Sequence, residues 1–320
     1  MLKILADGEF HSGERLAEEF GLSRAAVWKH VRKLVRWGLS VESVSGRGYR
    51  LAAPLELLDA DALRHALSAD SRFALDCLDV FIEVDSTNAL LLQHPPSSPD
   101  ALRICIAEWQ SQGRGRLERR WNSPLASGLC LSAAWTYAGS PGDLSALSLA
   151  AGVAVADAIA ACCGVQPKLK WPNDLVFDGR KLGGILVESR FEAQGRCSVV
   201  VGVGINIALP VQLLEELSDW PGGAIDLRTA GALVSRQALA VAVAGALGVL
   251  LSQLQDTGPG AWLARWRELD LLNGRPVRVR SDAHSLEGIA AGIDDDGALL
   301  VSVAGDVRRI LAGDASVRTP

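Results

Sequence analysis

One stretch organises the chain: Ile104-Cys105-Ile106-Ala107-Glu108-Trp109-Gln110-Ser111-Gln112-Gly113-Arg114-Gly115-Arg116-Leu117-Glu118-Arg119-Arg120-Trp121. Its first four residues are apolar and predict a buried strand. Glycine in the loop that follows lets the backbone approach a ligand closely. Arginine offers a planar fork of donors for phosphate or carboxylate, and tryptophan offers a flat face for stacking. The stretch therefore predicts a loop that closes over an anionic ligand with a planar ring.

The bulk composition describes an ordinary soluble protein with one unusual segment. The chain has 320 residues and a formal net charge of −5, with 49% hydrophobic and 22% charged residues. This length suits two or three domains. The net charge excludes a general nucleic-acid binder, yet residues 21–50 carry seven Lys or Arg against one acid, Glu42. Such a local basic patch predicts a module that faces DNA or phosphate.

Cysteines and apolar runs point to a cytoplasmic protein without a membrane span. The six cysteines lack metal-ligand spacing and stand mostly in apolar runs, so reduced thiols are expected. Charge interrupts residues 1–7, which therefore do not resemble a signal peptide. The long apolar run 144–163 contains Asp157, and run 238–251 is shorter than the roughly 18–20 residues needed to cross a bilayer. Both runs predict buried helices.

Residues 14–20 and 24–37 predict two helices joined by a tight turn at Gly21. Ser23 is the expected N-cap of the second helix. Its inward stripe is predicted to hold Val27, Val31, Leu34 and Val35. Another face repeats Arg24, Trp28, Arg32 and Arg36 at every fourth position. This is the helix-turn-helix pattern, in which the second helix enters the major groove of DNA.

A hairpin follows the two helices. Residues 41–45 and 49–51 flank a tip that contains Gly46, Arg47 and Gly48, as in the wing of a winged helix-turn-helix. The DNA-binding residues predicted from this module are Ser23, Arg24, Trp28, Lys29, Arg32 and Arg47. Two interpretations of Trp28 stay open, contact with a thymine methyl group or packing against the hairpin. A small helical domain with a solvated basic face is the alternative for the whole module.

The remainder predicts an α+β core and a small β domain. Helices are expected at 59–67, 144–163, 236–255 and 261–271, and strands at 79–84, 128–135, 181–188 and 199–207. Residues 169–177 are expected to form a strand, a turn and a second strand. Strands joined by hairpins, with helices between groups of strands, indicate a mixed or antiparallel sheet. Short strands over 276–311 predict a terminal all-β barrel. The run 85–88 is either a helix N-cap or a group of polar side chains that reach a ligand at a helix N-terminus.

Five motifs stand in one order along the chain: Asp85-Ser86-Thr87-Asn88, Gly113-Arg114-Gly115-Arg116, Lys170-Trp171-Pro172-Asn173-Asp174, Arg180-Lys181-Leu182-Gly183-Gly184-Ile185-Leu186-Val187-Glu188 and Gly202-Val203-Gly204-Ile205-Asn206. Together with both flanking domains, they resemble the bacterial bifunctional biotin–protein ligase and biotin-operon repressor over nearly the whole chain. The resemblance implies a winged helix-turn-helix over 1–52, a mixed-sheet α+β domain like the biotin and lipoate ligases over 53–271, and an SH3-like barrel over 272–320.

The resemblance also implies a two-step reaction. The carboxylate of biotin attacks the α-phosphate of ATP in the presence of Mg²⁺ and gives biotinyl-5′-adenylate. A lysine of the biotin carboxyl carrier protein of acetyl-CoA carboxylase then takes the biotinyl group. In the repressor class the adenylate promotes formation of a homodimer that binds operator DNA. Two alternatives stay open: a DNA-binding sensor of the adenylate without ligase activity, and a lipoate–protein ligase.

Fixed cations are needed to bring a carboxylate up to a polyphosphate, and the motifs supply them. By the resemblance, the catalytic residues are Lys181, Arg116 and Asp174. Biotin is assigned to Ser86, Thr87, Asn88, Gln110, Arg114, Gly115, Arg116 and Lys181. The nucleotide is assigned to Arg119, Trp121, Lys170, Asn173, Asn206 and Arg318. Asp174 either orients the incoming lysine or binds Mg²⁺, and no other metal ligand is predicted.

The motifs also have plainer interpretations, and one residue departs from the family pattern. The run 170–174 is also good turn chemistry, and the arginine cluster could be a solvated face or an RNA-contact loop. In the usual family loop, a glycine stands at the place of Glu118. An acid beside arginines that face phosphate puts the closed loop in question, unless it pairs with Arg119 or Arg120.

Overall fold

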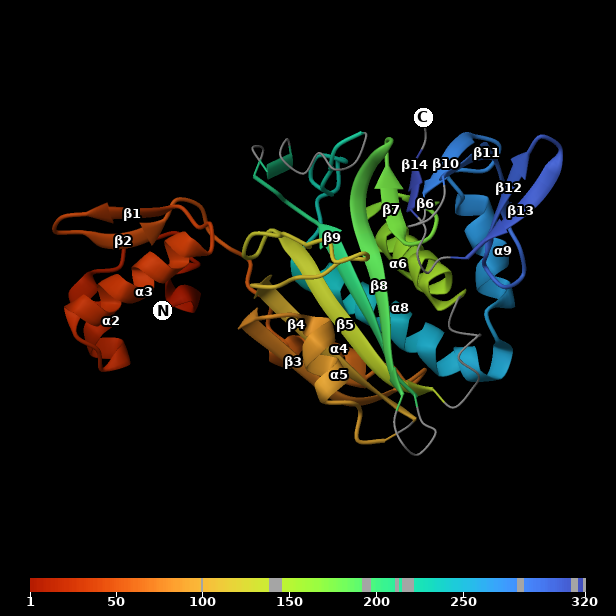
Figure 1. The fold of residues 1–320 in the computed structure, drawn as a ribbon. Helices are drawn as coiled ribbons and strands as arrows, with labels where there is room; N and C mark the ends of the chain where they lie inside the picture. The colour runs from red at the N-terminus through yellow and green to blue at the C-terminus, as the bar shows by residue number, and fades with distance from the viewer. Residues whose placement is uncertain are drawn as a thin grey trace.

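The computed structural model describes residues 1–98, 100–137, 146–191, 197–210, 213–214, 222–280, 285–311 and 316–318. In this part of the chain the strands form three sheets, of two, seven and five strands. Figure 1 shows the N-terminal elements at one end, the seven-stranded sheet in the centre and the five-stranded sheet at the other end. The site described below lies on the central sheet.

The N-terminal module is a helix-turn-helix followed by a hairpin. It contains α1 (Leu2–Leu5), α2 (Gly13–Phe20), α3 (Arg24–Arg36), β1 (Val41–Val44) and β2 (Gly48–Leu51). The hydroxyls of Ser12 and Ser23 accept the backbone N–H groups of Arg15 and Ala26, so both helices begin at a capped end. Gly21 ends α2 with φ 61°, which makes the tight turn. The helix-turn-helix prediction is confirmed.

One residue of the predicted inward stripe of α3 was placed wrongly. Val27, Val31 and Leu34 are buried, as predicted, but the side chain of Val35 is 55% exposed. Val35 lies at the edge of the stripe, about 80° around the helix from Val27 at 100° per residue. At this edge Val35 faces solvent and not the core of the module.

The central part of the chain forms a mixed sheet with helices on both faces. Its elements are α4 (Ala60–Ser68), β3 (Ala74–Val84), α5 (Thr87–Gln93), β4 (Ala101–Gln110), β5 (Gly128–Tyr137), α6 (Leu147–Cys163), β6 (Lys168–Lys170), β7 (Asp174–Phe177), β8 (Arg180–Phe191), β9 (Cys197–Asn206), α8 (Arg236–Thr257) and α9 (Gly260–Leu269). The strand order is β3-β4-β5-β9-β8-β7-β6, with β3 and β4 parallel and the other neighbours antiparallel. The predicted mixed sheet is confirmed.

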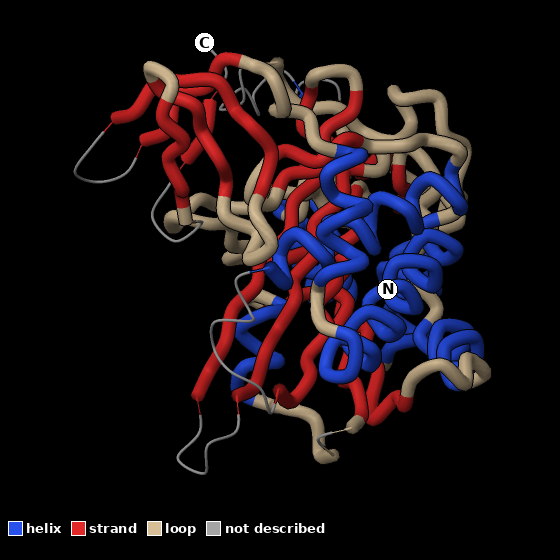
Figure 2. The backbone as a smooth tube through the Cα atoms, turned by 90° about the vertical axis from the view of Figure 1, so that its right-hand side faces the viewer, coloured by secondary structure: helices blue, strands red, loops and turns tan. Residues whose placement is uncertain are grey.

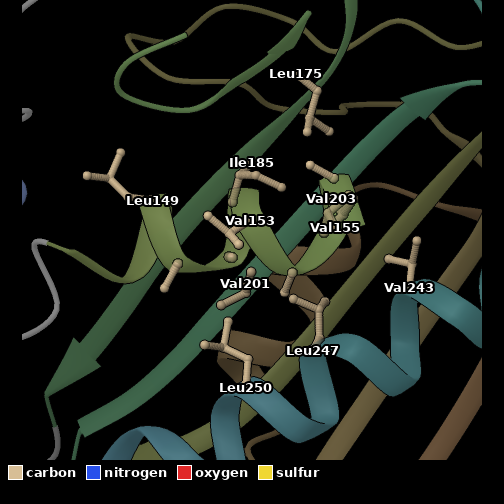
Figure 3. Close-up of a cluster of buried hydrophobic side chains, with 14 of the residues drawn as sticks. Leu149, Val153, Val155, Leu175, Ile185, Val201, Val203, Val243, Leu247 and Leu250 are labelled. Carbon is tan, nitrogen blue, oxygen red and sulfur yellow. The ribbon is translucent and has the colours of Figure 1, made fainter. Parts of the chain in front are cut away.

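The two faces of this sheet differ in side-chain size. Along β9, Val201, Val203 and Ile205 join the large core that contains α6 and α8, as Figure 3 shows for the two valines. Figure 2 shows the long helices along one side of the strands. On the other face α5 covers a smaller cluster, where Leu91 packs against Val200 of β9. Beyond that cluster β9 presents glycine, so this face keeps room for a ligand.

The two apolar runs are core helices. Within the described residues, one helix is long and apolar enough to cross a membrane by length and composition, Arg236–Leu254 with a mean hydropathy of 1.8. Its side chains at Leu239, Val243 and Leu247 are fully buried in the core. Most of α6 is buried as well. The first residues of the predicted run at 144 lie outside the described residues.

The buried cysteines, Cys105, Cys130 and Cys197, behave as small apolar side chains, while the other three are half-buried. All six are free thiols. Burial raises the pKa of Cys105 to about 12 and that of Cys130 to about 11. Both thiols are therefore protonated at neutral pH and are poor nucleophiles. The interpretation of the cysteines as core residues agrees with these positions.

The C-terminal part is a five-stranded antiparallel sheet. It contains β10 (Pro276–Arg280), β11 (Ser285–Ile293), β12 (Leu299–Val303), β13 (Asp306–Ile310) and β14 (Ser316–Arg318), in the order β13-β12-β11-β10-β14. The sequence pattern missed β14, which has only three residues and too short an alternation to recognise. The indole Nε1 of Trp171 donates to the carbonyl of Gly297 at 3.0 Å and joins this part to the central one.

The N-terminal module contacts the ends of β3 and β4. The Trp37 and Trp109 rings lie 6.2 Å apart between centroids, and Lys33 Nζ lies 2.6 Å from a carboxylate oxygen of Glu83. Leu125, just after the arginine loop, is buried in the apolar cluster of the N-terminal module. Residues on both sides of the loop therefore contact the N-terminal module.

A buried ion pair fixes the strand that leads into the loop. Arg236 Nη2 at the start of α8 lies 2.7 Å from Glu108 Oε2 on β4, and the two side chains are 5% and 1% exposed. Glu108 Oε1 also accepts the backbone N–H of Leu58 at 2.6 Å, and Arg236 donates to the carbonyl of Gly128 on β5. The pair thus joins β4, β5, α8 and the segment before α4.

We expect Arg236→Met to lower the free energy of unfolding by about 3–5 kcal/mol, because Glu108 would keep a buried charge without its partner. Urea unfolding followed by circular dichroism measures the change. Arg265→Met is the matched control, because Arg265 pairs with Asp157 where both side chains are more than a third exposed. It should cost about 1 kcal/mol or less. Equal losses in the two variants would contradict a special role for the Glu108–Arg236 pair.

Candidate active site

A cavity of about 460 Å³ lies on the central sheet, beside the N-terminal end of α5 at Thr87. Its size suits a small-molecule site. The predicted ligand residues that line it come from all five motifs: Ser86, Thr87, Asn88, Gln110, Arg114, Gly115, Arg116, Arg119, Trp121, Lys170, Asn173, Asp174, Lys181 and Asn206. Residues up to 120 positions apart in the sequence therefore meet around one space.

The arginine loop folds back on itself as a narrow hairpin. The N–H of Trp121 donates to the carbonyl of Gly113 at 2.9 Å, and the N–H of Gly115 donates to that of Arg119 at 2.7 Å. At the tip Leu117 and Glu118 have φ of 53° and 57°. This left-handed conformation favours glycine, so the place of Glu118 in the loop is one where a glycine fits without strain.

The two tryptophans of the loop have different surroundings. Trp121 lines the cavity and lies over Gly204 of β9, where an added Cβ atom would come within 2.5 Å of the indole ring. Trp109 instead packs near Trp37 of the N-terminal module. Trp121 is thus the aromatic face of this loop that a ligand in the cavity can reach.

The helix start at α5 serves as both a cap and a cavity wall. The hydroxyl of Ser86 accepts the N–H of Ala89 at 3.4 Å, as an N-cap does. Gln110 Oε1 accepts the backbone N–H of Thr87 at 2.8 Å, which joins the end of β4 to the same turn. Ser86, Thr87 and Asn88 are all buried and line the cavity. The two interpretations of 85–88 are therefore compatible.

A second ion pair stands on the hairpin of β7 and β8. Asp178 and Gly179 have φ of 50° and 70°, which suits a two-residue hairpin turn. The hairpin brings Lys181 Nζ to 2.5 Å from Asp174 Oδ1, with the side chains 31% and 15% exposed. Both residues line the cavity, so a carboxylate and an ammonium group face a ligand there together.

Two amide side chains hold the cavity walls. Asn173 Nδ2 donates to the carbonyl of Ile185 at 2.7 Å. Asn206 Nδ2 donates to the carbonyl of Ile225 at 3.1 Å. Asn206, a polar residue at the end of an apolar strand, therefore joins β9 to the segment around Ile225. The carbonyl oxygens of the two amides remain the ends with which a ligand could bond.

The cavity walls are rich in cations. Arg114, Arg116, Arg119, Lys170 and Lys181 line it, with Arg120 beside them, and Asp174 is the carboxylate among its described lining residues. No group of three His, Cys, Asp or Glu suited to a metal ion occurs in the part of the chain that the structure describes. The arrangement fits a ligand with several negative charges.

The predicted DNA-binding residues lie on α3 and at the tip of the hairpin, and Trp28, Lys29 and Arg32 line a hollow that Glu83 and Trp109 also line. Arg24, Lys29 and Arg32 are exposed on α3, while the Ser23 hydroxyl serves as the cap. Trp28 is 49% exposed, and the Arg32 guanidinium lies 4.8 Å from its ring centroid. This contact shows Trp28 beside Arg32 on the helix surface. At the hairpin tip the Arg47 guanidinium lies 4.1 Å over the ring of Phe10.

Sequence reasoning missed part of the site. The cavity lining also includes Arg120, Asn122, Leu186, Gly202, Gly204 and Ala224. The alternation of valine and glycine along β9 was the available signal, because it marks one crowded and one open face of a strand. Ala224 lies on a segment without a pattern and gave no signal. The side chain of Arg318 lies outside the described residues, although its neighbour Val317 lines the cavity.

Three family models match the chain. Residues 80–206 match the biotin/lipoate A/B protein ligase family, residues 1–50 match a helix-turn-helix domain, and residues 273–318 match the biotin protein ligase C-terminal domain. Among solved structures, the biotin protein ligase from Aquifex aeolicus in complex with biotin and ATP has a TM-score of 0.62. That ligase is 24% identical in sequence, and the match spans 77% of this chain and 100% of the ligase chain. The match supports the fold.

Curated relatives are similar over the full length. The bifunctional ligase/repressor BirA of Salmonella typhimurium is 37% identical over 100% of this chain and 97% of its own length. That of Escherichia coli is 38% identical over 100% of this chain and 96% of its own. This similarity over the whole length, together with the match of residues 80–206 to the biotin/lipoate ligase model, shows the family. The chain belongs to the BirA family of bifunctional ligase/repressors.

Proposed function

We propose that the protein is an ATP-dependent biotin–protein ligase that also represses transcription in response to biotin. One observation supports this most strongly: the residues of five separate motifs line one cation-rich cavity, in a chain that also has an exposed basic recognition helix. The family relatives combine the same two activities in their names. The substrates are biotin, ATP and a lysine of the biotin carboxyl carrier protein of acetyl-CoA carboxylase.

In the first step, a carboxylate oxygen of biotin forms a bond to the α-phosphorus of ATP, and the bond from that phosphorus to pyrophosphate breaks. Two anions must approach each other, so fixed cations that stabilise the developing charge lower the barrier. We assign this to Arg116 and Lys181 as the catalytic cations. Ser86, Thr87, Asn88, Gln110, Arg114 and Gly115 hold biotin beside them.

The nucleotide is assigned to the other end of the cavity. Trp121 offers its face to adenine, and Arg119 and Lys170 offer positive charge to the phosphates. Asn173 and Asn206 present amide oxygens while their amino groups hold the walls. Arg318 completes this set by the resemblance. The position of Trp121 over Gly204 supports the assignment, because the indole is seated against the sheet.

In the second step, the amine of the carrier lysine attacks the carbonyl carbon of the adenylate, the bond from that carbon to the phosphate oxygen breaks, and AMP leaves. Asp174 either orients this amine or contacts Mg²⁺. Magnesium commonly binds through one or two carboxylates together with substrate phosphates. Asp174, the carboxylate among the described lining residues, fits an ion that arrives with ATP and would offset phosphate charge. In both roles the Lys181 ammonium holds Asp174 in place.

The same proposal includes the domain bounds, the homodimer and the cellular location. We place a winged helix-turn-helix at 1–52, the ligase domain at 53–271 and an SH3-like barrel at 272–320. The five antiparallel strands of the last segment support the barrel. A homodimer promoted by biotinyl-5′-adenylate would present two recognition helices to the operator, as helix-turn-helix dimers do. The free thiols support a cytoplasmic location.

One assay tests the function directly. The protein is incubated with labelled biotin, MgATP and a biotin carboxyl carrier domain. Transfer of label to the carrier lysine is expected. Adenylate binding without transfer would instead favour the sensor without ligase activity. A thermal shift produced by lipoate and not by biotin would favour a lipoate–protein ligase.

Arg116→Gly should speed the dissociation of biotinyl-5′-adenylate by about 10- to 100-fold, because the variant cannot make a charged hydrogen bond to the ligand. Released adenylate would then label lysines of unrelated proteins. Dissociation is measured by chasing labelled adenylate with unlabelled biotin and ATP. The control is Arg275→Gly, at an exposed bend before β10. An unchanged dissociation rate in Arg116→Gly would remove Arg116 from the proposed site.

Deletion of residues 1–52 should abolish binding to operator DNA in a gel shift with biotin and ATP. The deletion would also uncover Trp109 and Leu125, so a second variant keeps the fold. Replacement of Arg24, Lys29 and Arg32 by alanine should weaken binding and lower the slope of log affinity against log salt by roughly one for each phosphate that is no longer neutralised. Operator binding that survives both changes would show that the DNA-binding surface lies elsewhere.

A further inference from the structure

A line of hydrogen bonds runs beneath the biotin end of the cavity. It begins at Ser132, a fully buried hydroxyl on β5 whose Oγ lies 2.7 Å from Thr87 Oγ1 and 2.6 Å from Asn88 Oδ1. Asn88 Nδ2 donates to Glu188 Oε2 at 2.8 Å. The Glu188 carboxylate in turn lies 3.2 Å from Nη2 of Arg114 in the arginine loop. The line thus reaches from the sheet to the loop above the cavity.

The acceptors on β8 set the direction of the bonds made by Asn88. Asn88 Nδ2 faces the Glu188 carboxylate and the carbonyl of Leu186, which both accept, so Oδ1 must face Ser132. Oδ1 only accepts, and the Ser132 proton therefore points to it. The Thr87 hydroxyl has two oxygen neighbours, Ser132 Oγ at 2.7 Å and Gln110 Oε1 at 3.1 Å, and one proton to share between them. With either direction, a lone pair of Thr87 Oγ1 is left to accept an N–H donor of a ligand in the cavity.

The position of the Asn88 amide depends on a glycine of β9. An added Cβ atom at Gly202 would lie 2.2 Å from Asn88 Oδ1, so the amide occupies the space that a side chain on β9 would fill. Strand pairing also puts Leu186 opposite Gly202, with Glu188 two residues further along β8 on the same face. Glu188 is therefore held by the sheet, while its partner Arg114 belongs to a loop. A carboxylate on a rigid strand can fix the position of a loop arginine.

We propose that Glu188 is a positioning residue of the biotin site. It orients the Asn88 amide and holds the Arg114 guanidinium, and so couples the floor of the biotin pocket to the loop that covers it. The inference rests on the proposed function, because it concerns the biotin end of that same cavity. Because Arg114 already pairs with Glu188, Arg114 holds the loop beside biotin. The other cations of the cavity then neutralise the charge of the phosphates.

The test compares Glu188→Gln with Glu188→Ala in the full-length protein. Glutamine keeps an acceptor for Asn88 Nδ2 but turns an amide N–H group toward Arg114, which removes the ion pair. We expect about a fivefold rise in the KM for biotin, and a similar rise in the Kd for biotin alone, in Glu188→Gln. Glu188→Ala also leaves the Asn88 donor without an acceptor and should raise both by about tenfold or more. The KM for ATP should stay unchanged.

The matched control is Glu287→Gln, which removes a carboxylate that pairs with Arg278 on the exposed surface of the C-terminal sheet. Its KM for biotin should equal that of the unmodified protein. A double variant, Glu188→Ala with Arg114→Ala, should show a smaller effect than the product of the single effects, because both residues act through one ion pair.

Two results would overturn the inference: an unchanged KM for biotin in Glu188→Ala, or equal increases in the KM for biotin and for ATP together with a lower Tm, which would indicate a general structural role. Failure of the proposed function is a separate result. In that case the unmodified protein itself would not release pyrophosphate from ATP in the presence of biotin, and the Glu188 variants would not need to be compared.

Discussion

Two missing side chains on β9 create the space on which the site depends. A Cβ atom at Gly202 would collide with the Asn88 amide, and one at Gly204 would collide with the Trp121 ring. The same strand presents Val201 and Val203 to the core on its opposite face. Because successive residues of a strand point to opposite faces, one sequence can build a close-packed core and an open ligand surface together. The proposed biotin and nucleotide ends thus meet the sheet at neighbouring glycines.

The arginine loop needs firm ends if its tip is to close over a ligand with a defined geometry. Its first strand is held by the buried Glu108–Arg236 pair, and the segment after it is held by Leu125 in the apolar cluster of the N-terminal module. Trp109 also faces that module, so the end of β4 that leads into the loop lies against Trp37 at the end of the recognition helix. Residues that flank the ligand loop thereby form part of the contact between the DNA-binding module and the ligase core.

The sequence predicted the elements well, because periodicity and capping act locally. The resemblance to a known family, and not any local pattern, predicted that the residues of five motifs share one site, and most of them line one cavity. The sequence did not predict partners that depend on strand register: nothing near Glu188 or Ser132 shows that β8 and β5 place them on either side of Asn88. Arg236, at the start of an apolar helix, likewise gave no sign of its pair with Glu108. Val35 was misplaced because an edge position is decided by what covers it.

The backbone conformation of Glu118, and not an ion pair with a neighbouring arginine, explains why glycine is usual at its place. The expected pairing with Arg119 or Arg120 is absent from the ion pairs of the described residues, and the Arg120 guanidinium instead donates to the carbonyl of Ser111. Glu118 follows Leu117 in the same left-handed conformation, which costs about 1 kcal/mol or more for a residue with a side chain. The usual glycine at this place is thus explained by backbone geometry. The exposed carboxylate at the tip leaves the cation-rich lining of the cavity intact, because Arg114, Arg116 and Arg119 still line it.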